Sequence, residues 1–532
     1  MTDEELRTHL DNEIRNSVGL DTSELSTQRK TAMDYFYGEP FGNEMEGRSS
    51  YVSPDVRDTI LWIMPSLMRI FTGGDHIVRF EPQGPEDEQK ANQATDYVNY
   101  IFQRQNDGFL TLHTWFMDAL MSKNGFTKVY WDVSKDTSVE EYDDLDDMEF
   151  VMIANDPEVE ILEHTEEEEN GVKTHDIKLR RSKENKQCRI IPVPPEEILV
   201  NKTPNQVLSK NRFIAHRRRV TISELREMGY ENVEGLNSYE NQDFNTERTA
   251  RLSFDETDTQ DIATTEENKM VWLAECFVKM DLDGDGIAEN NTVIMAGDRI
   301  LEKHEGHTAR IVSLTPIPLP HKLFGMSISD LVMDLQLLKS TIFRQILDNM
   351  YLANNGRYMA LDGMVNIDDL LTSRPGGIVR VKTFDAVKPM QPPLLGAPAF
   401  NLLEYVDHIK DVRTGVNKDL QGLDPDTINR TATAQSNRLG AAQSRIELIA
   451  RIFAETGVKD LFYAILECVQ KHQKKDTVIK LKNQWVPMNP REWTNKFDLT
   501  VSVGLGTGSK DSIIGALLET IKLQMADMQM GL

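Results

Sequence analysis

The chain has 532 residues, of which 39% are hydrophobic, and carries a formal net charge of −27 at neutral pH. Because this length exceeds one ordinary hydrophobic core, we expect about two to four structural units. The acidic excess argues against a protein that coats nucleic acid, and no apolar run is long enough to cross a bilayer.

The N-terminus is charged from Asp3 onward, which is unlike a secretory signal. The three cysteines (Cys188, Cys276 and Cys468) lie far apart in the sequence. Their spacing fits no metal-binding motif and is typical of a reducing compartment.

The first 324 residues mix helical and strand patterns. Helices are predicted over 2–36, 56–71, 86–103, 109–123 and 221–229. In the second of these, Ser53 is the expected N-cap, Pro54 the first helical residue, and Pro65 a kink or interruption. Strands are predicted over 78–80, 127–131, 150–153, 174–179, 188–193, 198–200, 212–220, 272–280, 292–295, 300–301 and 311–314.

Two segments of this part stand out by composition. Residues 131–170 hold 17 Asp and Glu against the single basic residue Lys135, and we interpret them as a solvated acidic surface. Residues 239–269 are rich in Asn, Asp, Thr and Glu, which predicts a mobile surface loop. The prolines of 316–320 predict an extended linker, where we place the first domain boundary.

The central part, from residue 325 onward, is predicted to be mainly helical. A helix with one broad apolar face covers 325–354, and a second covers 400–418. Between them lies an insert, 355–399, with a helical turn at 365–371 and a strand at 378–381. An insert of about forty residues rarely builds a sufficient core alone, so we expect it to need neighbours.

A polar loop, 419–432, leads into a long helix, 433–472, in which Gly457 is a candidate kink. Strands at 478–481 and 497–503 and a terminal helix at 512–529 are predicted to follow. Over 401–480 the charges nearly balance, with 12 Lys and Arg against 11 Asp and Glu.

An acidic loop at 281–289 matches the front of a calcium-binding loop. Asp281, Asp283, Asp285 and Glu289 supply oxygens at the first, third, fifth and ninth positions, and Gly286 stands at the sixth. The twelfth position is Thr292 rather than the expected Glu. The alternative is an Asp-Gly hairpin turn without metal.

Two other motifs are weaker. Residues 503–510 have the glycines of a phosphate loop, but Ser509 precedes Lys510 and Asp511 replaces the required hydroxyl, which favours a plain connection. Residues 216–219 are basic, and because strand side chains alternate, at most two of them face one way. A structural or subunit-contact role is the stronger interpretation, with DNA contact as the alternative. The histidines are scattered, and no catalytic constellation is visible in the sequence.

Several segments in order resemble the portal proteins of short-tailed bacteriophages of the P22 type. They are residues 47–56 (GRSSYVSPDV) with the following helix, 213–229, 281–289, the 325–354 helix with Asp330, Asp334, Gln336 and Arg344, the turn at 374–377, and 431–451.

The resemblance implies an α+β, portal-type subunit of a homo-oligomeric ring of about twelve copies at one capsid vertex. The implied regions are an α/β wing at 1–324, a stem of helices 325–354 and 400–418, an α/β clip at 355–399, a tunnel loop at 419–432, a long channel helix at 433–472, and a wing and helical crown return at 473–532.

The resemblance also implies a role and partners. Double-stranded DNA would pass through the ring during packaging and ejection, and the protein would bind terminase, tail-adaptor or head-completion proteins, and capsid and scaffolding proteins. It would be assembled in the host cytoplasm, located in the virion, and would act without enzymatic activity or cofactor. Candidate channel cations are Lys339, Arg344, Arg413, Lys418, Arg430 and Arg438, with ion pairs between subunits or within helices as the alternative.

Two other functions stay open on the sequence alone. One is a calcium-dependent hydrolase or nuclease built on the 281–289 loop. The other is a structural scaffold protein that forms no channel.

Overall fold

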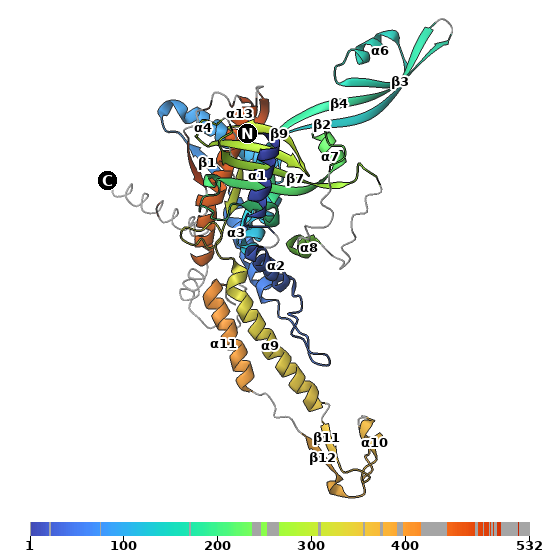
Figure 1. Cartoon of the computed structure of the whole chain (residues 1–532), viewed down its shortest axis with the longest axis vertical. Coiled ribbons are helices and arrows are strands. Elements are labelled where there is room, and N and C mark those ends of the chain that lie inside the picture. Colours follow the sequence, from blue (N-terminus) through green and yellow to red (C-terminus); the bar gives the residue numbers. More distant parts are fainter. Residues whose placement is uncertain are drawn as a thin grey trace, which may run out of the picture.

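The structure is a computed structural model of the whole chain. It describes residues 2–20, 23–74, 76–169, 172–236, 246–252, 265–282, 284–306, 310–354, 357–372, 376–390, 397–416 and 444–473, and shorter stretches at 477–481, 484–488, 490, 493, 497–501 and 520. The molecule is elongated, with a mixed body, a long β arm that projects from one side, and two long helices that lead away to a small insert (Figure 1). This mixture of helices and sheets confirms the α+β class.

A helical core forms the centre of the body. It combines α2 (Glu24–Tyr37), α3 (Asp55–Thr72), α4 (Glu88–Tyr100) and α5 (Gly108–Ser122) with a long C-terminal helix that contains α13 (Lys459–His472). Aromatic side chains fill this core, and Phe116 lies 5.1 Å from Phe71 and 5.0 Å from Phe453 between ring centres. Each such side chain removes a large apolar area from water.

The predicted helix over 2–36 is two helices, α1 (Asp3–Arg15) and α2. The break falls at Gly19, whose φ is +100°, in the region that favours glycine. A Cβ there would lie 2.6 Å from the carbonyl oxygen of Ile198, so this residue also permits a close backbone approach.

The prediction for the start of α3 is wrong in detail. Pro54 occupies the N-cap without a side-chain cap, because the Ser53 hydroxyl donates instead to the Asp55 carboxylate at 2.6 Å. The helix also continues through Pro65 without interruption.

A five-stranded antiparallel sheet lies beside the helical core. Its order is β5 (Ile198–Val200), β6 (Phe213–Thr221), β7 (Met270–Met280), β8 (Glu289–Ala296) and β9 (Arg299–Glu305). α1 packs on one face through Leu6 and Leu10, and α7 (Ile222–Glu227) follows β6. Within the predicted mobile loop, Thr246–Leu252 forms a helix, α8, that packs against α2. The loop prediction is therefore wrong for these residues.

The arm is a four-stranded sheet in the order β10 (Ile311–Leu314), β2 (Gly125–Leu145), β4 (Val172–Val193) and β3 (Val159–Glu169). The paired β2 and β4 strands carry it away from the body (Figure 1). Near its end lies α6 (Asp147–Ala154), where a strand was predicted at 150–153. The capping box between Asp146 and Glu149 starts a helix there and overrides the strand-like composition.

Short elements complete the body. β1 (Val78–Glu81) pairs with β15 (Asp498–Val501), and β13 (Thr477–Leu481) pairs with β14 (Gln484–Met488). Single 3-10 turns cover Pro85–Asp87, Pro195–Glu197 and Leu208–Lys210, and π-helical turns cover Ile101–Gln105 and Ala454–Val458.

The two long helices are α9 (Ile328–Asn354) and α11 (Ala397–Thr414), close to the predicted positions. The insert between them contains β11 (Arg357–Ala360), α10 (Ile367–Leu371), a 3-10 turn (Phe384–Ala386) and β12 (Val387–Met390). The strand predicted at 378–381 is absent, since only Val381 forms an isolated bridge, to Val365.

The long helix predicted at 433–472 is described from residue 444. Gly457 lies in a π-helical turn, where a Cβ would lie 2.1 Å from Cδ2 of Leu314. The loop at 419–432, the phosphate-loop-like residues 503–510 and nearly all of the predicted terminal helix lie outside the described residues. Among the residues that are described, no helix is both long and apolar enough to cross a membrane.

Candidate functional site: the paired long helices and their junction with the body

The two long helices contact each other through a narrow apolar seam. Its buried members are Leu335, Ile342 and Ile346 of α9 and Leu403 and Val406 of α11. These positions recur at the spacing of three and four that places side chains on one helix face. The pair is thus a unit with its own small core, separate from the core of the body.

The start of α9 is fixed to the body. The Ser327 hydroxyl accepts from the backbone N–H of Asp330 at 3.1 Å, and the Asp330 carboxylate accepts from the Ser327 N–H at 2.8 Å. Lys123 of the body forms an ion pair with Asp330 at 3.1 Å. At Gly325 a Cβ would lie 2.2 Å from the carbonyl oxygen of Ile317, so only glycine allows the linker to fold back.

A cluster of four charges, of which Asp55 is buried and the other three are partly buried, joins α9 and α11 to the first turn of α3. The Asp55 carboxylate accepts from Lys339 at 3.0 Å and from Lys410 at 2.9 Å. Lys339 also donates to the Asp407 carboxylate at 2.8 Å. The same carboxylate lies 3.6 Å from the ammonium group of Lys410. Two carboxylates therefore face two ammonium groups, and the junction is close to neutral.

The electrostatics of this cluster favour its charged form. Burial acts to raise the pKa of Asp55, but Lys410 and Lys339 outweigh it and hold the pKa below its usual value. Burial acts to lower the pKa of Lys339, but the attraction of Asp55 and the bond to Asp407 raise it. Both charges are therefore retained, because buried charges are tolerated when paired.

A loop that we call the strap, residues 41–52, runs beside α9 (the blue loop in Figure 1) and is held by Arg344. The Arg344 guanidinium donates to the carbonyl oxygen of Tyr51 at 2.7 Å, to Asn43 at 2.8 Å and to Glu44 at 2.6 Å. It also lies 5.4 Å from the centre of the Phe41 ring. One side chain of α9 thus contacts both ends of the strap and holds it against the helix.

Other polar side chains of α9 extend this contact toward α3. Asp348 accepts from the N–H of Ser49 at 2.7 Å, and Gln336 accepts from the N–H of Val56 at 2.8 Å. Ser340 accepts from the N–H of Ser53 at 3.0 Å. Sequence reasoning missed this contact; the polar spacing of 336, 340, 344 and 348 along one helix face was the available signal.

The structure places three of the predicted channel cations within ion pairs of the same chain. Lys339 belongs to the Asp55 cluster, Arg344 holds the strap, and Arg413 pairs with Asp334 at 2.7 Å. Lys339 and Arg344 are largely buried, whereas Arg413 is 40% exposed. These pairs join different elements of one chain, and so differ from the pairs between subunits or within one helix that the sequence offered as the alternative. Lys418, Arg430 and Arg438 lie outside the described residues.

Large apolar side chains are exposed to solvent on α11 and in the insert. On α11, Leu402, Tyr405 and Val412 are 44%, 60% and 64% exposed. In the insert, Phe384 is fully exposed and Ile378 is 86% exposed. A concentration of exposed apolar area on a folded subunit marks a surface that contacts another protein.

The sequence model of the phage SU10 portal protein family matches residues 6–532. The chain belongs to this family. The match covers the body, both long helices and the insert, so the resemblance to phage portal proteins is confirmed for nearly the whole chain. No curated protein matches it. Portal proteins are structural components of the phage virion, and the chain has this role.

The acidic loop of this portal-family chain forms the hairpin connection between β7 and β8. Both Asp281 oxygens accept backbone N–H groups, from Gly284 at 2.5 Å and from Gly286 at 2.8 Å. Asp285 accepts from the N–H of Ile287 at 2.7 Å, and Glu289 pairs with Met280 at the start of β8. Asp283 lies outside the described residues. Among the described residues no group of three metal-ligating side chains converges.

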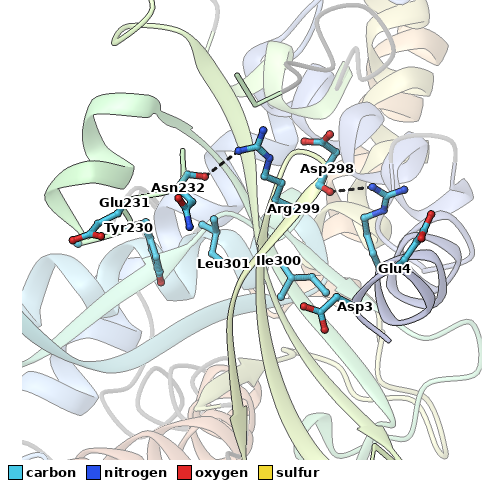
Figure 2. Close-up of a pocket in the computed structure, with 11 residues that line it drawn as sticks. Asp3, Glu4, Tyr230, Glu231, Asn232, Asp298, Arg299, Ile300 and Leu301 are labelled. Carbon is cyan, nitrogen blue, oxygen red and sulfur yellow. Dashed lines mark hydrogen bonds between the residues drawn. The ribbon is translucent and has the colours of Figure 1, made fainter. Parts of the chain in front are cut away.

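A hollow on the portal body lies between the first turn of α1 and the β8–β9 turn (Figure 2). Arg7 donates to the carbonyl oxygen of Asp298 at 3.1 Å, and Arg299 donates to that of Asn232 at 3.4 Å. Its lining mixes acidic, basic and apolar side chains.

The basic residues of β6 are partly used inside the body. His216 contacts Glu197 at 3.2 Å, and Arg217 and Arg219 both lie over the Trp272 ring, at 4.1 and 5.1 Å from its centre. Two arginines of alternate positions thus share one face, as the strand period requires. Stacking on an aromatic ring supports a structural role for them.

Proposed function

We propose that the chain is one subunit of a ring at the capsid vertex, through which double-stranded DNA is packaged and ejected. In this proposal the body and arm (1–324) are the wing, α9 and α11 (325–354 and 400–418) are the stem, and the insert (355–399) is the clip. Residues 419–432 are the tunnel loop, 433–472 the channel helix, and 473–532 the wing and crown return. The ring assembles in the host cytoplasm and then resides in the virion.

The observation that carries this proposal is the second apolar stripe on α11. Leu403 and Val406 are already covered by α9, yet Leu402, Tyr405 and Val412 form an exposed stripe that borders this seam. With 3.6 residues per turn these three positions fall within one side of the helix. A neighbouring copy that packs stem against stem would cover them, as in an obligate oligomer.

The insert supports the same arrangement. More of its apolar side chains are exposed than buried. Among its described positions, Ala386 is the single apolar residue that is buried. A ring would bring neighbouring inserts together and bury part of this surface. The remaining outer edge is the place we propose for terminase during packaging and for tail-adaptor proteins afterwards.

The charges of the stem suit passage of DNA better than capture of DNA. Each phosphate that a protein neutralises adds affinity, so a channel wall rich in unpaired cations would hold the duplex. Lys339, Lys410 and Arg344 are instead paired with carboxylates of the same subunit. The proposed role is geometric and needs no cofactor, and the energy for packaging comes from a separate ATPase.

The test is direct imaging of the purified chain by electron microscopy, with mass photometry to count the copies. We expect closed rings with a central channel. Replacing the exposed stripe (Tyr405→Ser with Val412→Ser) should convert most rings to monomers, since it removes apolar area from the contact between copies. Glu404→Ser, at an exposed position on neither stripe, should leave the rings intact.

Two results would contradict the proposal. One is a monodisperse monomer at high protein concentration, which would favour a scaffold protein without a channel. The other is a ring that is as stable in the Tyr405→Ser/Val412→Ser variant as in the wild type, which would show that neighbouring subunits do not contact each other through this stripe of α11.

A further inference from the structure

The end of the β arm carries a helix, α6, whose outer face exposes apolar side chains to solvent. α6 buries none of its residues, and Met148, Val151 and Met152 are 76%, 53% and 73% exposed. The positions i, i+3 and i+4 place these three side chains on one side of the helix. Isolated exposed apolar residues are ordinary, but three neighbours on one short helix form a patch.

The opposite face of α6 holds the helix firmly to the arm. Phe150 stacks on His164 and on His175, each with ring centres 4.6 Å apart. His175 contacts the Asp147 carboxylate at 2.8 Å and His164 at 2.9 Å. A fixed inner face with an exposed outer one is a preorganised platform, which reduces the entropy lost when a partner binds.

The segments on either side of the patch are acidic in sequence, although Arg180 and Arg181 of β4 pair with Glu160 and Asp156. Residues 143–160 contain 8 Asp and Glu and no Lys or Arg. The whole arm segment, 131–193, has 19 acidic against 8 basic residues. Phosphate backbones and anionic membranes would be repelled here, whereas a basic protein segment would be attracted.

We propose that the outer face of α6 (Met148, Val151 and Met152) is a docking surface for a basic, amphipathic segment of another protein. The apolar side of that segment covers the two methionines, whose flexible thioethers adapt to different contours. Its lysines and arginines face the carboxylates before and after the helix. A second copy of this chain is disfavoured as the occupant, because it has the same acidic arm and a net charge of −27.

The test uses the full chain and a fluorescein-labelled peptide of eighteen residues, about five helical turns, with leucines on one helical face and lysines on the other. Binding is followed by fluorescence anisotropy at physiological salt. We expect the wild type to bind, and Met148→Ser/Met152→Ser to weaken binding at least about tenfold by removing the apolar contact.

The matched control is Val133→Ser/Val139→Ser, which removes two valines that are 53% and 56% exposed on β2 of the same acidic arm. This variant should bind within about twofold of the wild type, because its charge is unchanged and α6 is intact. A peptide with glutamate in place of lysine should not bind.

Three results would overturn the proposal: no binding to the wild type, equal weakening in both double variants, or equal binding of the glutamate peptide. Light scattering adds a fourth, since loss of self-association in the methionine variant would identify a second copy as the occupant. Binding of the peptide to the arm requires neither DNA nor ring formation, so the measurement can fail or succeed independently of the proposed portal function.

Discussion

Glu247 is completely buried in the body, between α8 and α2, in a cluster of charged side chains. It lies 3.9 Å from Arg29 and accepts a hydrogen bond from Ser26 at 3.1 Å. Arg251, from the same short helix, pairs with Asp118 at 2.7 Å and with Glu196 at 2.9 Å. Three carboxylates therefore share two guanidinium groups, so the negative charges of the fully ionised cluster would exceed its positive charges by one.

The consequence is a proton held by the folded protein. Burial raises the pKa of Glu247 to about 7 from an ordinary value of 4.5, against the opposing effect of Arg29. The unfolded chain loses this proton at lower pH than the folded one. Stability should therefore fall as the pH rises from about 4.5 to about 7, and this contribution should be constant at higher pH.

Replacing this carboxyl by an amide tests the prediction. Glu247→Gln should reduce the loss of unfolding free energy between pH 5 and pH 7.5, an effect on the order of 2 kcal/mol in the wild type. Thermal unfolding across this pH range measures it. Glu227→Gln, on the exposed side of α7, is the control; a variant Glu247→Gln with the full wild-type pH dependence would rule this residue out.

At the scale of the element, sequence patterns located most helices and strands but not what each element contacts. The α9 pattern predicted a helix because its apolar residues recur at helical spacing, and the structure confirms it. On the sequence, Lys339 and Arg344 of this helix are candidate channel cations. The structure adds contacts that the pattern does not show, because Gln336, Ser340 and Arg344 hold the strap and α3. Residues 150–153 were predicted as a strand because aromatic and branched side chains favour strands, but the cap at Asp146 and the stacking of Phe150 select a helix.

The strap provides a prediction at this scale. Arg344→Ala should leave several strap carbonyl and side-chain acceptors without a donor, and tryptic cleavage after Arg48 should accelerate at least about tenfold. Limited proteolysis followed by mass spectrometry measures this rate.

Arg413→Ala is the matched control, because Arg413 is 40% exposed and its ion pair with the 58% exposed Asp334 contributes little to stability. It should leave cleavage after Arg48 unchanged. If both variants were cleaved alike, the strap would be held by something other than the Arg344 contacts.

At the scale of the whole molecule, the chain consists of parts with separate cores. The arm contributes Val129, Cys188 and Ile190 to the core of the body, all near its base. Beyond Asp132, which pairs with Gln187, the strands pack mainly on one another (Figure 1). The two long helices likewise have their own seam.

The prediction is that the outer arm can be removed without unfolding the body. Replacing residues 133–186 by a short glycine–serine turn should change the melting temperature by less than about 3 °C, since the core residues at the base remain. Calorimetry checks the melting temperature, and imaging checks that the ring is retained. Replacing 125–193 should instead unfold the body, because it also removes core residues. If both deletion variants had the same melting temperature, the outer arm would not be separate in stability from the body.

The sequence by itself determined the positions of the two long helices and the insert, which follow from periodicity, caps and prolines that act over a few residues. Its motifs also carried the family resemblance, which implied the α+β class. Only the tertiary structure decided the partners of the charges, because an ion pair such as Lys339 with Asp55 joins residues far apart in the chain. It also decided which apolar residues stay exposed, since Leu402 and Leu403 are neighbours in sequence and only the second faces α9.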